Sequence, residues 1–176
     1  MYVRYLTRGL IDGSLSTLGI VLGAAIGGDP RIVIAAGLGG ALANGLSNVL
    51  GALSAEKAAV MEVLSDYDKA MVGSKTKLKD TRIYQQEQKK IIGGGITDGV
   101  ATFFGAIVPI IPFIFMGGES LTQAIYFSII LTMVLLFVLG IYLGKKAKEN
   151  FLISGIKMVI FAGVVALAAS SLEMII

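Results

Sequence analysis

Five long apolar segments dominate this 176-residue chain and restrict the folds that it can adopt. Each is near or above the roughly 20 residues that a helix needs to cross the hydrocarbon of a bilayer. Because lipid offers no hydrogen bonds, each segment must satisfy its own backbone groups, which favours helices. The predicted spans are Leu10–Gly28, Arg31–Ala55, Ile91–Met116, Leu121–Gly144 and Phe151–Ile175.

The composition agrees with this interpretation. Hydrophobic residues make up 55% of the chain and charged residues 15%, whereas a soluble domain carries about 25% charged residues. We therefore expect an all-α, multi-pass integral membrane protein. No cleavable targeting segment is visible, so the cell membrane is the expected location if the source is prokaryotic. The net charge of +3 reflects basic loops and does not indicate a nucleic-acid partner.

The basic residues predict the orientation. Arg31 is the only basic residue on the side of the first turn, whereas the N-terminal tail and the loops after the second and fourth spans hold clusters of basic residues. These clusters contain Arg4, Arg8, Lys57, Lys69, Lys75, Lys77, Lys79, Arg82, Lys89, Lys90, Lys145, Lys146 and Lys148. Since basic loops stay in the cytoplasm, we expect a cytoplasmic N-terminus and a C-terminus outside.

The chain divides into three predicted parts. Residues 1–55 hold an interfacial segment, Met1–Gly9, and the first two spans; residues 91–176 hold the last three. Residues 56–90 form a charged cytoplasmic insert. We expect its first half to continue the second helix, a break at Gly73–Ser74, and a second short helix at Lys75–Lys90 on the membrane surface.

Cysteine and histidine are both absent. This excludes a disulfide framework, a Cys/His zinc site, a cysteine nucleophile and a Ser–His pair. We therefore expect no enzyme activity and no permanently bound cofactor. A metal ion would have to be bound by carboxylates, amides, hydroxyls, carbonyls or methionine thioethers, which favours hard or borderline divalent cations over copper or zinc.

The first two spans contain the principal candidate site. Asp12 lies in an apolar segment, where an ionisable residue is a functional-site hypothesis because its burial is costly. Asn44 and Asn48, four residues apart, share one face of the second span. They either hold helices together by hydrogen bonds or line an ion path with Asp12 and Thr17. Small residues every four positions predict close packing of these helices: Gly19, Gly23 and Gly27, and Ala36, Gly40 and Ala52.

Other charged residues have two open interpretations each. Asp98 in the third span is either a second acid of the path or a helix N-cap, an alternative that also applies to Asp12. Lys157 in the fifth span either extends to the interface or offsets an acid.

In the third span, Pro109 and Pro112 free carbonyl groups that need a partner.

Three acids of the insert, Glu56, Glu62 and Asp66, also allow two interpretations. They form either a solvated helix face or a cytoplasmic cluster that captures cations. Glu62 and Asp66 are four residues apart and share a face.

Three motifs together resemble the vacuolar iron transporter family, the nodulin-like cation exporters. These are Asp12-Gly13-Ser14-Leu15-Ser16-Thr17 in the first span, Ser47–Leu53 in the second, and Gly105–Phe113 with its two prolines in the third. The five-span order with a charged insert between the second and third spans also matches, so the resemblance covers most of the chain.

This resemblance implies a homodimer with a path between the first and second helices of both copies. It implies export of a divalent metal from the cytoplasm in exchange for protons, with Asp12 as the aspartate of the path. Asn48 stands where the family usually has methionine, and Ala52 where it has an acid. An amide is a harder ligand than a thioether, so manganese or magnesium joins iron as an expected substrate. The alternative is a non-transporting membrane scaffold that kept the fold.

Overall fold

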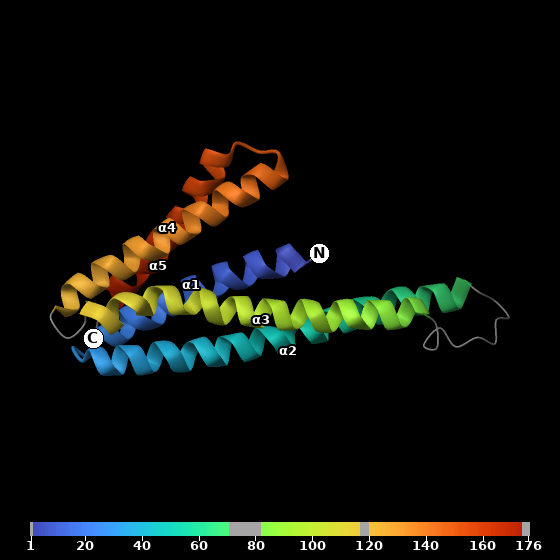
Figure 1. Ribbon diagram of the computed structural model, residues 1–176, viewed down its shortest axis with the longest axis horizontal. Coiled ribbons are helices and arrows are strands. Elements are labelled where there is room, and N and C mark those ends of the chain that lie inside the picture. Colours follow the sequence, from blue (N-terminus) through green and yellow to red (C-terminus); the bar gives the residue numbers. More distant parts are fainter. Residues whose placement is uncertain (1, 71–81, 117–119, 174–176) are drawn as a thin grey trace.

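Five helices that alternate in direction make up the computed structural model, which describes residues 2–70, 82–116 and 120–173 (Figure 1). The helices are α1 (Tyr2–Ala25), α2 (Pro30–Ala70), α3 (Arg82–Met116), α4 (Leu121–Ala147) and α5 (Phe151–Glu173). The prediction of five helices is confirmed.

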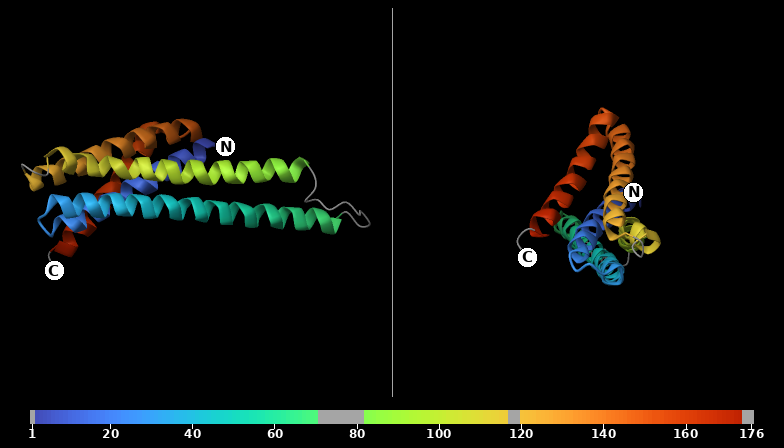
Figure 2. Two further views of the ribbon diagram at one scale, coloured as in Figure 1. Left: turned by 60° about the horizontal axis from the view of Figure 1, so that its bottom comes forward. Right: turned by 90° about the vertical axis from the view of Figure 1, so that its left-hand side faces the viewer.

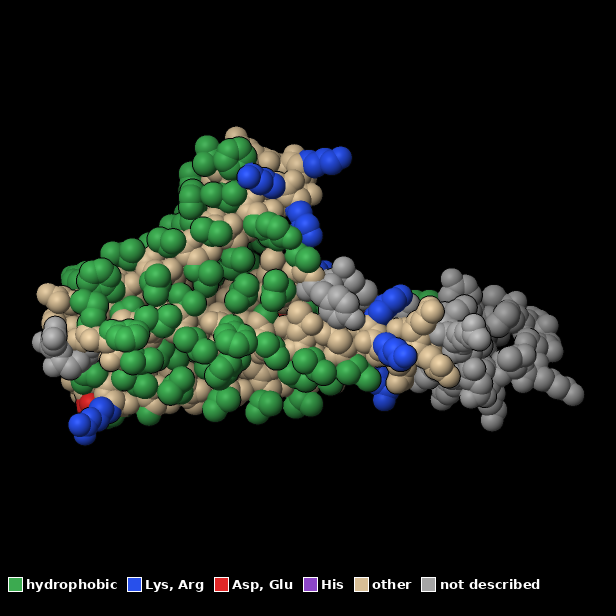
Figure 3. All heavy atoms as spheres, in the orientation of Figure 1, with side chains coloured by type: hydrophobic (Ala, Val, Ile, Leu, Met, Phe, Trp, Pro, Cys, Tyr) green, Lys and Arg blue, Asp and Glu red, His purple; other side chains and the backbone are tan. Residues whose placement is uncertain are grey.

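Four of these helices are long and apolar enough to cross a membrane. The qualifying segments are Pro30–Val63, Gln88–Met116, Leu121–Ala147 and Phe151–Ser171. Large apolar side chains are exposed along them, as lipid-facing surfaces require; Figure 3 shows how apolar groups cover one face. The protein is therefore a multi-pass membrane protein. α1 is not among the four because its charged residues lower its hydropathy, so its crossing stays a prediction.

The turn between α1 and α2 follows directly from three consecutive residues. Gly28 has a φ of +75°, which glycine adopts without steric cost. The Asp29 carboxylate then accepts a hydrogen bond from the Arg31 N–H at 2.8 Å and caps α2. Pro30 occupies the first helical position, where a missing N–H costs nothing. The turn therefore lies between the first two predicted spans, which end at Gly28 and begin at Arg31.

The insert differs from its prediction in one respect. α2 continues to Ala70, which confirms that the first half of the insert extends the second span. The predicted break at Gly73–Ser74 lies outside the described residues. From Arg82 onward, however, the chain is the start of α3 and not a separate surface helix. The glycines that follow do not end the helix, because Gly94 and Gly95 pack against the side chains of Tyr5 and Leu53.

α3 packs along both α1 and α2, while α4 and α5 form a pair at one side (Figure 2). One apolar cluster joins α1, α2, α3 and α4, and a second joins α1, α4 and α5. The first contains Val21, Ala25, Val33, Ile110, Phe113 and Ala124; the second contains Leu18, Leu22, Leu136, Ala162 and Ala169. α1 therefore links the three-helix unit to the α4–α5 pair.

The backbones of α1 and α3 touch at Gly9 and Gly13. A Cβ atom added to either glycine would overlap backbone oxygen atoms of α3, those of Asp98 and Thr102 respectively. Small residues spaced four apart allow this kind of approach between membrane helices. The contact fixes the depth of Asp98 and Thr102 relative to the residues of α1.

Within one chain, the predicted packing stripe of α1 is not the face that makes the close helix contact. Among the described residues of the chain, a Cβ added at Gly23 would meet no atom within 4 Å, and one added at Gly19 would meet only the Val165 side chain, at 3.6 Å. The four-residue repeat of Gly19, Gly23 and Gly27 lies on a different face from the true contact, which Gly9 and Gly13 make at the start of the apolar run. On α2 the prediction holds better: Gly40 contacts Ile20 of α1 and Ala52 is buried.

Candidate functional site

A line of polar side chains connects α1 and α2 inside the apolar part of the molecule. We call it the polar seam and define it by Asp12 and Ser16 of α1 and Asn44 and Asn48 of α2. The Asn48 Nδ2 donates to Asp12 Oδ2 at 2.6 Å, and the Asn44 Nδ2 donates to Ser16 Oγ at 2.7 Å. The asparagines thus face α1, as their spacing predicted.

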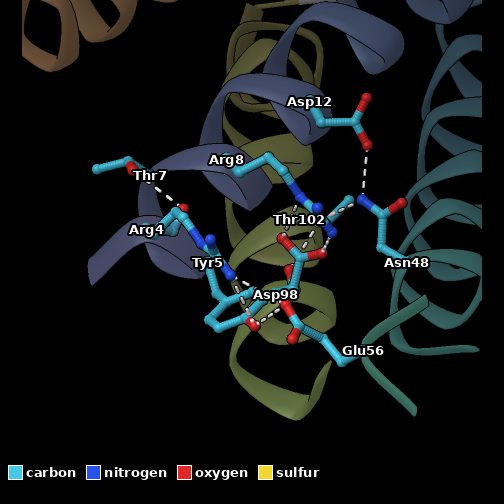
Figure 4. A network of polar contacts seen from close by, with 9 residues as sticks. All are labelled: Arg4, Tyr5, Thr7, Arg8, Asp12, Asn48, Glu56, Asp98 and Thr102. Carbon is cyan, nitrogen blue, oxygen red and sulfur yellow. Dashed lines mark hydrogen bonds and ion pairs between the residues drawn. The ribbon is translucent and has the colours of Figure 1, made fainter. Parts of the chain in front are cut away.

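Asp12 lies half-buried in the interior of α1, so the N-cap alternative is wrong for this residue. Asn48 also donates to Thr102 Oγ1 of α3 at 2.8 Å and so ties three helices together at the depth of Asp12 (Figure 4). Within the described residues, Asp12 Oδ1 accepts no hydrogen bond and the carboxylate forms no ion pair. This oxygen is available to a ligand.

The amide groups of the polar seam present nitrogen, not oxygen, to α1. Both Asn44 and Asn48 act as donors there, whereas a cation needs oxygen ligands. In this arrangement Asn48 orients the Asp12 carboxylate. Its amide would have to turn over to contribute an oxygen to the same ion.

Thr17 lies apart from the polar seam. It follows Gly13 by four residues and therefore shares the face of α1 that packs on α3. Its side chain is fully buried, and its hydroxyl has no hydrogen-bond partner within the described part of the chain. The structure does not bring Thr17 together with Asp12 and the asparagines.

Asp98 lies in the interior of α3, sixteen residues after its start at Arg82, so the N-cap alternative is wrong here as well. Its carboxylate is fully buried and forms an ion pair with Arg8 of α1. The Arg8 Nε lies 3.3 Å from Asp98 Oδ1, and its Nη2 contacts Oδ2. Sequence reasoning missed this partner, because Arg8 has the position of an interfacial anchor.

The end of α1 nearest the N-terminus is tied to α2. Glu56 accepts hydrogen bonds from the Tyr5 hydroxyl and from Arg4 Nη2, the latter at 2.9 Å. Glu62 and Asp66 are exposed further along α2. Within the described residues no three acids are grouped to hold a metal ion, so the predicted capture cluster is not assembled.

The remaining candidates are placed as follows. α3 continues through Pro109 and Pro112, and the Ser128 hydroxyl of α4 donates to the Pro109 carbonyl at 2.7 Å. This contact ties α4 to α3 beside the prolines, whereas the carbonyls that the prolines free are those of Gly105 and Val108, four residues earlier. Lys157 is exposed on α5 and forms no ion pair with a described residue, which favours extension to the interface.

The fold and the polar seam define a polytopic membrane protein that holds acidic and amide groups between its first three helices. A sequence model of the VIT family matches residues 51–172. An uncharacterized protein of Methanocaldococcus jannaschii is 44% identical over 170 residues, which cover 97% of this chain and 87% of that relative. The chain therefore belongs to the VIT family, and the resemblance seen in its motifs is confirmed.

The match to the family does not reach every candidate residue. It includes Asp98, Glu56 and the two prolines of α3, but it begins after Asp12, Asn44 and Asn48. The assignment of Asp12 to a transport path therefore rests on its position in α1 and on its contacts, and it stays a prediction.

Proposed function

We propose that this protein is a divalent-cation transporter in which Asp12 binds the ion. Membership of the VIT family supports metal-ion transport in general. The observation that carries the specific proposal is the Asp12 carboxylate, which is held on one oxygen by Asn48 at 2.6 Å while its other oxygen accepts no hydrogen bond from a described residue. An ionisable group in an apolar bundle costs free energy to bury, and groups of this kind mark ion or proton pathways in membrane proteins.

The residues of the polar seam define a proposed chemistry. Asp12 acts as cation ligand and as proton acceptor, so that a metal ion and protons exchange at the same carboxylate. Asn48 positions this carboxylate, and Asn44 with Ser16 extends the polar path along α1 and α2. A carboxylate ligand suits iron(II), manganese(II) or magnesium(II). We further propose that two copies of the chain pair along α1 and α2 and enclose the path.

The distribution of charge supports one orientation in the membrane, and for that orientation we propose export from the cytoplasm. The N-terminus, the distant ends of α2 and α3 and the α4–α5 turn lie toward one end of the molecule (Figure 1). Lysine and arginine side chains gather at that end (Figure 3). By the positive-inside rule this end faces the cytoplasm. Under this orientation, cations would enter past Glu56 and leave on the side of Arg31.

Ion flux into proteoliposomes tests the proposal. The full chain is reconstituted with a pH dye inside, and uptake of manganese(II), iron(II), magnesium(II) and calcium(II) is measured for the wild type and for Asp12→Asn and Asp12→Ala. We expect saturable flux of at least one ion with an opposing proton signal, and loss of both in the variants. Full flux in folded Asp12→Asn protein would rule out Asp12 as the cation and proton site.

A non-transporting scaffold is the second candidate. Two observations favour it: the amide nitrogen of Asn48 faces Asp12, and Ala52 is buried where the resemblance leads one to expect an acid. Folded protein that shows neither flux nor saturable binding of manganese(II), iron(II) or magnesium(II) would support the scaffold.

A further inference from the structure

The Arg8–Asp98 pair places a full positive charge beside the polar seam. Asp98 is 0% exposed, while the Arg8 side chain is 57% exposed and reaches it from the neighbouring helix. Two guanidinium nitrogens face the two carboxylate oxygens, which is the bidentate arrangement that arginine favours. Without Arg8, Asp98 would be a buried charge that needs another cation or a proton.

Asp12 lies one helical turn after Arg8. Residues four apart on a helix are neighbours, with about 5–6 Å between their Cβ atoms. Figure 4 shows the Arg8 side chain passing beneath Asp12 on its way to Asp98. Two acids and one arginine leave one net negative charge in this group, and only the Asp12 carboxylate is without a cationic partner within the described residues.

We propose that Arg8 is a tethered counter-cation that sets the affinity of Asp12 for its ion. Arg8 occupies Asp98, so this second acid is not a ligand. At the same time its charge, one turn away, repels a cation bound at Asp12. Both effects keep binding weak enough for release, which a transport site requires. The inference rests on the proposed function, since it concerns the affinity of the same carboxylate.

A purely structural ion pair gives a different expectation. If Arg8 only fastened α1 to α3, removal of either partner would loosen the same contact, and both single variants would change cation affinity in the same direction. If Arg8 sets the charge, the two variants act in opposite directions. Arg8→Gln leaves two negative charges, Asp98→Asn leaves none, and the double variant restores the net charge of the wild type.

Manganese(II) binding to the full chain in lipid nanodiscs distinguishes the two. We expect Arg8→Gln to lower the Kd about tenfold or more and Asp98→Asn to raise it by a similar factor, because removing a unit charge about one helical turn away changes the electrostatic energy of a cation at Asp12. The double variant Arg8→Gln/Asp98→Asn and the charge-conserving Arg8→Lys should remain near the wild-type Kd. Arg31→Gln, which removes the same charge at the far end of α2, is the matched control and should leave the Kd unchanged.

Each outcome decides the inference. Opposite shifts in the two single variants support it, and shifts in the same direction, or none, overturn it. If Arg8→Gln does not fold, Asp98→Asn and the double variant still decide: the first must weaken binding and the second must restore it. A wild type whose binding depends on Asp12 but ignores Arg8 and Asp98 refutes this inference alone. A wild type with no saturable binding refutes the proposed function and this inference with it.

Discussion

The amide nitrogen of Asn48 lies 2.6 Å from Asp12 Oδ2 and 2.8 Å from Thr102 Oγ1, so one side chain of α2 joins α1 and α3. Thr102 in turn donates to the Asp98 carbonyl at 2.8 Å. This series of hydrogen bonds connects the Asp12 carboxylate with the backbone of Asp98. It also explains why an amide fits here, since neither a thioether nor an alkyl group could donate to both oxygens.

Replacement of Asn48 by methionine should change ion preference. The variant introduces a soft thioether beside Asp12 and removes a donor from its carboxylate. We expect the ratio of iron(II) to manganese(II) uptake to rise severalfold, because softer ligands favour iron(II) over manganese(II) and magnesium(II). Competition flux in proteoliposomes measures this ratio. Asn48→Leu, similar in size but without sulfur, is the control; an equal ratio in both variants would contradict the prediction.

Gly13 is expected to tolerate no side chain. In Gly13→Ala the new methyl group would overlap the backbone of Thr102, and overpacking of this kind costs about 1–3 kcal/mol or more. Gly23→Ala is the control, since no atom of the described part of the chain lies within 4 Å of its added Cβ, and helix propensity alone should stabilise it by about 0.5–1 kcal/mol. Thermal unfolding in detergent should therefore show a lower Tm for the first variant and an equal or higher Tm for the second.

The two buried threonines should respond differently to valine. Thr17 has a hydroxyl without a partner among the described residues, so Thr17→Val removes an unsatisfied polar group and should raise stability by about 1 kcal/mol. Thr102→Val removes an acceptor from Asn48 and a donor from the Asp98 carbonyl, and should lower stability by about 1–3 kcal/mol. Denaturation of both variants under one condition provides the comparison. A loss of stability or flux in folded Thr17→Val would show that this hydroxyl serves a ligand.

Glu56 offers a test of the cytoplasmic capture hypothesis. In its pair with Arg4, the Arg4 side chain is 68% exposed and the Glu56 side chain 26% exposed, and ion pairs that solvent reaches contribute at most about 1 kcal/mol. Glu56→Gln should therefore change the Tm little. If Glu56 captures cations, the variant raises the KM for flux with kcat unchanged, and Glu62→Gln has a smaller effect because that exposed side chain lies further along α2, away from α1. An unchanged KM would leave Glu56 with a structural role.

The apolar segments by themselves determined the helices. The length of the apolar segments was sufficient to predict five helices. The residues Gly28, Asp29 and Pro30 account for the first turn, and the spacing of Asn44 and Asn48 predicts the face of α2 that meets α1. All three features depend on local sequence. The motifs of α1 and α3 were sufficient for the family. Helix ends in the insert were less predictable, since no local signal distinguishes a surface helix from the extension of a span.

Only the tertiary structure decided which polar groups meet. Arg8 and Asp98 are 90 residues apart, and their pairing depends on the contact of Gly9 and Gly13 with α3, which sets the depth of one helix against the other. The sequence shows Arg8 as an interfacial anchor and Asp98 as an acid with two open interpretations, because a helix alone does not specify its neighbour. The packing of the two backbones at Gly9 and Gly13 decides which residues of α3 face α1. It therefore also decides which charged groups lie near Asp12.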